Sequence, residues 1–186
     1  MTGQCDDSQL QGLLDLYRTE AAERIEATQA LIYEFPEDAR LHFMLGSTLI
    51  GDGRLIEGHA SLSRAVEIAP DFAIARFQLG LFQLTSGEAD NALDTWGRLD
   101  RLPEGHYLRC FVDGLRALIR DEFVQCAEHL RAGIALNTEN APLNTDMGLI
   151  IEKCEEIRSA GSASGEAPMT ETALILQQFS QRTRPN

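Results

Sequence analysis

The chain has 186 residues, of which 44% are hydrophobic and 24% charged, a composition typical of one folded domain with an apolar core. Its formal net charge of −13 argues against a nucleic-acid surface, because neutralising phosphates requires clustered Lys and Arg. The same charge disfavours an anionic membrane surface, and no apolar run is long enough for membrane insertion.

The N-terminal residues carry neither the basic segment nor the apolar segment of a secretory signal, and we expect residues 1–7 to be disordered. The four cysteines lack the paired C-x-x-C spacing of a metal site. We therefore expect reduced thiols and a cytoplasmic location. Of the four, Cys5 is expected to be the most reactive because it lies in this segment.

Residues 8–38 are interpreted as a degenerate first repeat that caps the N-terminal end. Three pairs of helices are predicted next, at 39–52 with 55–69, 73–86 with 89–102, and 106–120 with 123–136. Gly53 and Gly87 supply the first two turns, and Asp121 takes the same place in the third pair. Pro70 and Pro103 follow the first two pairs, where a helix should stop.

The last long helix is predicted at 141–158, with no turn where the earlier spacing would require one, and we interpret it as a C-terminal cap. Residues 159–168 are small and polar and predict a flexible linker. In residues 169–186, the spacing of Leu174, Leu176 and Phe179 predicts a short amphipathic helix followed by a tail.

A constant interval of 34 residues separates Gly46, Gly80, Gly114 and Gly148. Three phenylalanines recur in one phase at the same interval, at Phe43, Phe77 and Phe111. A fixed period of this length is typical of stacked helix–turn–helix units. The sequence therefore predicts an all-α solenoid of repeats.

These residues resemble the tetratricopeptide repeat family, over repeats 39–72, 73–106 and 107–140 and the first helix of a fourth unit. In that family small residues meet where two helices cross, which here pairs Gly46 with Gly58, Gly80 with Ala92, and Gly114 with Cys126. The position on the second helix where the family has a large apolar residue is occupied here by Leu62, Trp96 and Leu130. The chain departs from the pattern at His42, Arg76 and Cys110, where tryptophan is common, and at Leu99, Asp113 and Gly133. The resemblance implies a right-handed α-solenoid with capping helices.

The resemblance also implies that the first helix of each repeat lines a concave groove. The predicted partner-binding residues there are Phe43, Ser47, Ile50, Ile74, Phe77, Leu81, Leu84, Leu108, Phe111, Leu115, Leu118 and Leu149, with Ile119 beside them. An exposed apolar stripe of this length would need a cover. The cover would be the chain's own terminal helix, a second copy in a homodimer, or an apolar segment of a protein or peptide partner. The alternative is that these side chains are ordinary core between repeats.

The expected function is therefore a protein–protein interaction scaffold or adaptor that binds a peptide or apolar segment in the groove. A chaperone-like shield for a secreted client is one alternative, and a self-associating module with its groove filled by its own terminal helix is another. No catalytic, metal or cofactor site is expected, since the histidines His42, His59, His106 and His129 lack ligand spacing. Cys110 and Cys126 are expected to approach each other as inert core thiols.

Overall fold

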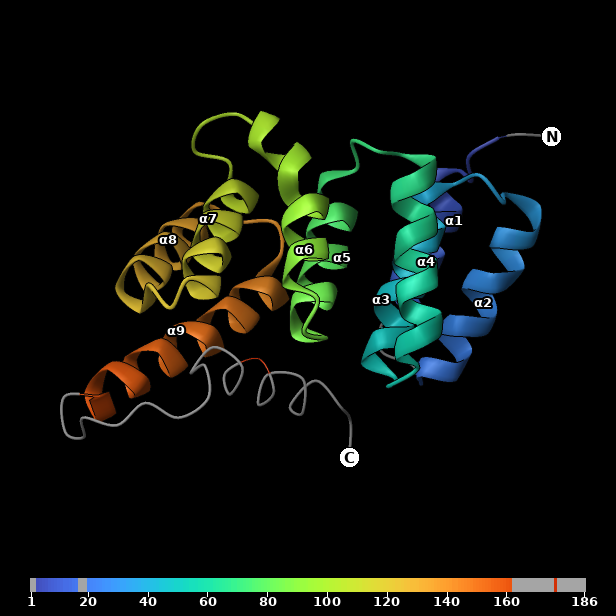
Figure 1. The fold of residues 1–186 in the computed structure, drawn as a ribbon. Helices are drawn as coiled ribbons and strands as arrows, with labels where there is room; N and C mark the ends of the chain where they lie inside the picture. The colour runs from blue at the N-terminus through green and yellow to red at the C-terminus, as the bar shows by residue number, and fades with distance from the viewer. Residues whose placement is uncertain (1–2, 17–19, 162–175, 177–186) are drawn as a thin grey trace. The chain divides into compact units, whose positions relative to one another are not determined.

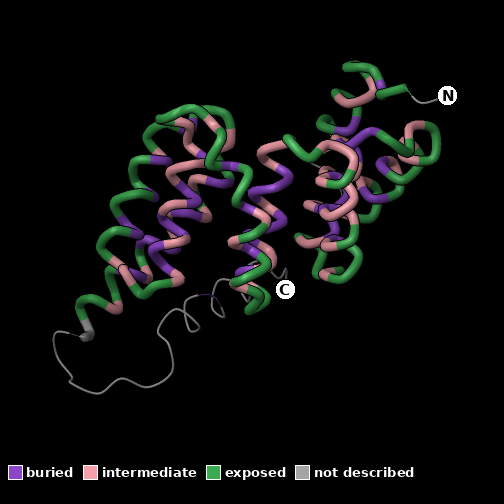
Figure 2. The backbone as a smooth tube through the Cα atoms, turned by 45° about the horizontal axis from the view of Figure 1, so that its top comes forward, coloured by how far each residue is buried: buried purple, intermediate pink, exposed green. Residues whose placement is uncertain are grey.

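The computed structural model describes residues 3–16, 20–161 and 176, and all regular structure in them is helical (Figure 1). This described part contains nine α-helices and one 3-10 helix and no strand, which confirms the all-α prediction. The chain forms two compact units, one ending at Leu79 and one beginning at Gly80, so that the boundary falls within α5. In each unit the buried positions follow the sides where neighbouring helices pack (Figure 2). Within the described ranges, no helix combines the length and the apolar content that crossing a membrane demands.

The first unit contains four complete helices and the first half of a fifth. They are α1 (Asp7–Asp15), α2 (Ala21–Glu34), α3 (Ala39–Gly51), α4 (Leu55–Ile68) and α5 (Ala73–Thr85). Helix α3 packs against both α2 and α4. One part of the core surrounds Cys5, Leu13 and Leu41, and another surrounds Ile25 and Leu49. The predicted N-terminal cap therefore consists of two helices whose apolar sides pack toward α3.

The segment before α1 is held against the start of α3. Cys5 is only 3% exposed, and its backbone N–H donates to Asp38 Oδ2 at 3.0 Å. Arg40 Nη2 donates to the Cys5 carbonyl oxygen and to Asp38 Oδ2, both at 2.7 Å. Asp38 is fully buried and caps α3 by accepting the backbone N–H of Arg40. The prediction of disorder over residues 1–7 is wrong at Cys5, because these hydrogen bonds order its backbone.

The second unit contains the rest of α5 and four further α-helices with one 3-10 helix. They are α6 (Ala89–Trp96), the 3-10 helix η2 (Gly97–Arg101), α7 (Tyr107–Ile119), α8 (Phe123–Leu136) and α9 (Ala141–Gly161). Helix α8 packs against both α7 and α9. The helix predicted over 89–102 differs from the structure, since it tightens into η2 at Gly97, a poor helix former, and this turn buries Leu99.

The predicted linker also differs from the structure at its start. Helix α9 continues to Gly161, so Ser159–Gly161 are helical rather than part of a flexible segment. The remainder of the predicted linker, and the predicted terminal helix apart from Leu176, lie outside the described residues.

The helix starts repeat at the interval predicted from the sequence. First helices begin at Ala39, Ala73, Tyr107 and Ala141, and second helices begin at Leu55, Ala89 and Phe123. The three turn positions share a left-handed backbone, with φ of 80° at Gly53, 86° at Gly87 and 58° at Asp121. Glycine adopts this conformation without a steric penalty, and aspartate is among the few other residues that tolerate it. The placement of Asp121 in a glycine's turn position is therefore confirmed.

Two of the predicted helix crossings are also confirmed. A Cβ atom added to Gly46 would lie 3.0 Å from the Gly58 carbonyl oxygen, and one added to Gly114 would lie 3.2 Å from that of Cys126. At Gly80 the added atom would overlap the indole of Trp96. Because the backbones approach this closely, the crossings leave no room for a side chain on the first helix.

Three asparagines determine how α9 leaves α8. The buried Asn137 side chain accepts the backbone N–H groups of Glu139 and Asn140 at 3.2 and 3.0 Å. Its Nδ2 donates to Asn144 Oδ1 at 2.8 Å, and Asn144 Nδ2 donates back to the Asn137 carbonyl oxygen at 3.0 Å. This network orders the turn and so positions α9 beside α8.

Candidate functional site

The partly exposed candidates of the first unit lie on α3 and at the start of α5. Phe43, Ser47 and Ile50 recur at helical spacing on α3, and all three are half-buried, as is Ile74 on α5. Ser47 Oγ lies 2.6 Å from the side-chain oxygen of Gln78, which connects the two helices. We call Phe43, Ser47, Ile74 and Gln78 the α3–α5 face, whereas the Ile50 side chain packs against Gly58 on α4. The α3–α5 face offers apolar side chains around one hydrogen-bonding pair.

Seven of the twelve predicted groove residues are instead buried. These are Phe77, Leu81, Leu84, Leu108, Phe111, Leu115 and Leu118, each 8% exposed or less. Phe111 shows the reason, because its ring fills the space beside Gly133 on α8 and meets the Tyr107 ring edge-on, with centroids 5.7 Å apart. In the structure these seven side chains are core, as the alternative interpretation of the sequence expected. Leu149 and the neighbouring Ile119 remain partly exposed.

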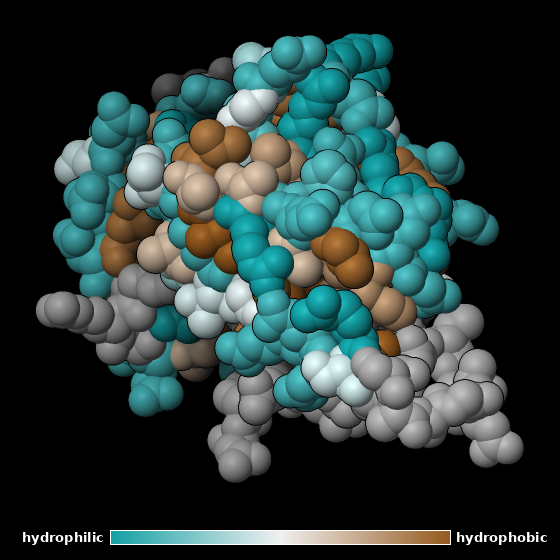
Figure 3. All heavy atoms as spheres, turned by 90° about the vertical axis from the view of Figure 1, so that its left-hand side faces the viewer, coloured by the Kyte–Doolittle hydropathy of each residue, from teal (hydrophilic) through white to brown (hydrophobic). Residues whose placement is uncertain are grey.

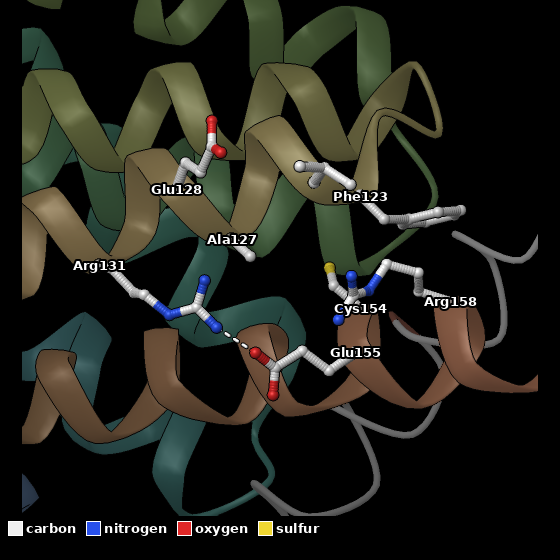
Figure 4. Close-up of a pocket in the computed structure, with 8 residues that line it drawn as sticks. Phe123, Ala127, Glu128, Arg131, Cys154, Glu155 and Arg158 are labelled. Atoms are coloured by element: carbon white, nitrogen blue, oxygen red, sulfur yellow. Dashed lines mark hydrogen bonds and ion pairs between the residues drawn. The ribbon is translucent and has the colours of Figure 1, made fainter.

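A pocket of about 210 Å³ lies between α8 and α9 in the second unit (Figure 4). Its lining residues are Phe123, Val124, Ala127, Glu128, Arg131, Cys154, Glu155 and Arg158. An ion pair between Arg131 on α8 and Glu155 on α9 spans the two helices. Seen from the left-hand side of Figure 1, the surface shows hydrophobic residues interspersed with hydrophilic ones (Figure 3). The pocket therefore combines apolar walls with charged groups of both signs.

The sulfur atoms of Cys126 and Cys154 meet beside this pocket. Cys126 on α8 and Cys154 on α9 are 0% and 1% exposed, and their Sγ atoms lie 3.7 Å apart. The sequence interpretation paired Cys126 with Cys110, but Cys110 lies beside Gly133 on α8. Gly133 is two helical turns from Cys126, about 10 Å along the axis. The pairing of Cys126 with Cys154 could not be predicted from the sequence, because it depends on how α9 packs against α8.

Burial and hydrogen bonding move the pKa values of the cysteines in different directions. Burial raises the pKa of Cys5 to about 11 and also raises the pKa of Cys110. The expectation that Cys5 is the most reactive thiol is therefore wrong, since its thiol is buried and held protonated. The hydrogen bond with Cys154, together with burial, raises the pKa of Cys126, whereas the same hydrogen bond lowers the pKa of Cys154. Of the two thiols, Cys154 is therefore the one that loses its proton more readily.

No group of three or more His, Cys, Asp or Glu side chains within the described ranges could hold a metal ion. The predicted absence of a catalytic, metal or cofactor site stays a prediction.

Comparison with models of known protein families finds no match, and comparison with curated proteins finds none either. The resemblance to tetratricopeptide repeats thus depends on the residues and on the spacing of the helices.

Proposed function

We propose that this protein is a helical-repeat scaffold of the tetratricopeptide type that binds a protein or peptide partner. The observation that carries the proposal is the recurrence of the helix starts at Ala39, Ala73, Tyr107 and Ala141, in phase with glycines at helix crossings. A chain built of repeated helical pairs presents an extended surface, and such surfaces are used for binding. The proposal includes the stacking of these pairs into a right-handed solenoid.

The partner-binding surface is the α3–α5 face. Its apolar members Phe43 and Ile74 are half-buried, so they keep accessible area for a partner while remaining ordered by their neighbours. The ring of Phe43 is held against that of Phe72, with centroids 5.3 Å apart. Preorganised aromatic and aliphatic side chains lose little entropy on binding. The matching partner is a short apolar segment with one hydrogen-bonding group for Ser47.

A photoreactive phenylalanine analogue in place of Phe43 is expected to cross-link a stoichiometric partner in a native lysate. The same analogue in place of Tyr33 on α2, which is 90% exposed, is the matched aromatic control and should not cross-link that partner. Phe43→Asp combined with Ile74→Asp should weaken capture by ~10-fold or more, because a charge would be buried against apolar partner atoms.

Ile56→Asp on α4 is the control for an added surface charge, since Ile56 is 88% exposed and lies outside the face. Circular dichroism should show all variants as helical as the parent chain. Equal capture by the double variant and the control, or equal cross-linking from positions 33 and 43, would contradict the proposed surface.

A second candidate function is a self-associating or self-covered module, whose apolar surface is filled by the terminal segment. The observation that favours it is the burial of Leu176, which is 8% exposed. For this candidate, truncation after Gly161 is expected to raise the fluorescence of a dye that binds apolar surface, or to produce oligomers in light scattering. Leu176→Asp in the full chain should reproduce the effect. Unchanged dye binding and unchanged mass in both variants would rule out this cover.

A further inference from the structure

The Cys126–Cys154 pair has the geometry of a dithiol that can close to a disulfide. The two sulfurs come from different helices of the same unit and are 3.7 Å apart. A disulfide requires about 2.05 Å between the sulfurs, so closure brings them together by less than 2 Å. Neither Cys5 nor Cys110 makes a sulfur–sulfur contact that would compete, among the residues described. The fold thus places one pair of thiols within reach of each other.

The pocket between α8 and α9 borders one thiol of the pair. Cys154 lines the pocket, whereas Cys126 does not. In Figure 4 the Cys154 sulfur rises from α9 toward α8, near Phe123 and Arg158. The apolar side chains of the pocket suit an aliphatic disulfide, and the charged groups on both helices suit polar ends. Cys154, although only 1% exposed, is therefore the thiol of the pair that lies nearer the pocket.

We propose that Cys126 and Cys154 form a redox-active site for a low-molecular-weight disulfide with charged ends, which enters the α8–α9 pocket. The Cys154 thiolate attacks one sulfur of this disulfide, forming a mixed disulfide and releasing the first small thiolate. The Cys126 thiolate then attacks the Cys154 sulfur and releases the second. The protein loses two electrons and two protons and gains one intramolecular disulfide, and the small disulfide is reduced to two thiols.

The lowered pKa of Cys154 agrees with this order of attack. Cys126 from α8 lowers this pKa through the hydrogen bond, whereas burial and the charge of Glu155 oppose the thiolate. The disulfide would connect α8 to α9 across the Asn137 turn. The disulfide therefore restrains α9, and this effect is independent of the scaffold function proposed above.

The test is peptide mapping of the folded full chain after incubation with oxidised glutathione. The expected product is one Cys126–Cys154 cross-link with the loss of two hydrogens, while Cys5 and Cys110 remain free thiols. The oxidised chain should melt roughly 5–10 °C higher than the reduced chain, because the cross-link restricts the unfolded state. Reduction with dithiothreitol should reverse both changes.

Three single variants distinguish the roles of the thiols. Cys126→Ala should accumulate one glutathione on Cys154, and Cys154→Ala should form neither the adduct nor the cross-link. Cys110→Ala is the matched control and should oxidise like the parent chain. Oxidation at Cys5 or Cys110 ahead of the pair, or a cross-link that forms only in denaturant, would overturn the proposal. This map of the parent chain decides the question even where a variant fails to fold.

Discussion

Replacing Asp38 with alanine is expected to lower the free energy of unfolding by ~3 kcal/mol, because it removes a buried ion-pair partner and a helix cap together. The carboxylate has no exposed surface and accepts hydrogen bonds from Arg40 Nε and Nη2 at 3.0 and 2.7 Å. It also accepts the Cys5 backbone N–H. Urea unfolding followed by circular dichroism would measure the loss. Glu26→Ala, an exposed acidic position on α2, should change stability by less than ~0.5 kcal/mol.

The same residue should make stability depend on acid pH. Burial raises the pKa of Asp38, but the hydrogen bonds donated by Arg40 and Cys5 outweigh it and lower the pKa to about 2. A carboxyl whose pKa is depressed by folding contributes stability above its ordinary value of 3.8 and loses it as the pH falls toward 2. The parent chain should therefore lose ~2 kcal/mol more than Asp38→Asn between pH 5 and pH 2. Parallel pH profiles for the two chains would contradict the lowered pKa.

Gly80→Ala is expected to lower the free energy of unfolding by ~2–3 kcal/mol, the second large effect. The new methyl group would overlap the indole of Trp96, which is 0% exposed and too rigid to move aside at low cost. The helices would have to separate at this crossing. Thermal unfolding would show the change as a lower melting temperature.

Gly148→Ala is the matched control, because Gly148 occupies the equivalent position two repeats after Gly80. In the part of the chain that the structure describes, a Cβ atom there meets no heavy atom of another element within 4 Å, so alanine should stabilise α9 by up to ~1 kcal/mol through helix propensity. Gly80→Ala combined with Trp96→Leu should lose less than the sum of the two single losses, since the smaller side chain relieves the overlap. Strictly additive losses, or equal effects at positions 80 and 148, would show that the crossing is not tight.

The α3–α5 face and the Cys126–Cys154 pair show where sequence reasoning was insufficient. The periodic pattern identified Phe43 and Phe111 as equivalent positions, yet Phe43 is half-buried and Phe111 is fully buried. Equivalent places in a repeat have equivalent local geometry, but their exposure depends on what packs next to each repeat. The sulfur contact to Cys154 likewise depends on the path of α9, which begins in phase with the earlier first helices but continues past the position where they end.

Two of the positions where the chain departs from the tetratricopeptide pattern make polar contacts in the structure. His42 Nε2 lies 2.9 Å from the Pro36 carbonyl oxygen, and Arg76 donates from Nη2 to that of Pro70 at 2.8 Å. Both contacts reach back six residues to a proline at the same phase of the repeat. The sequence contains this spacing, and it could have predicted a polar contact where the family often has tryptophan.

The sequence by itself determined the helical class, the period of 34 residues and the turn position of Asp121, because these depend on local backbone preferences and on close approach within one helix pair. Only the tertiary structure decided which apolar side chains are buried, that Cys5 is tied to Asp38, and that Cys126 meets Cys154. These contacts join residues 28 to 33 positions apart, so they depend on how separate helices pack, which no local pattern specifies.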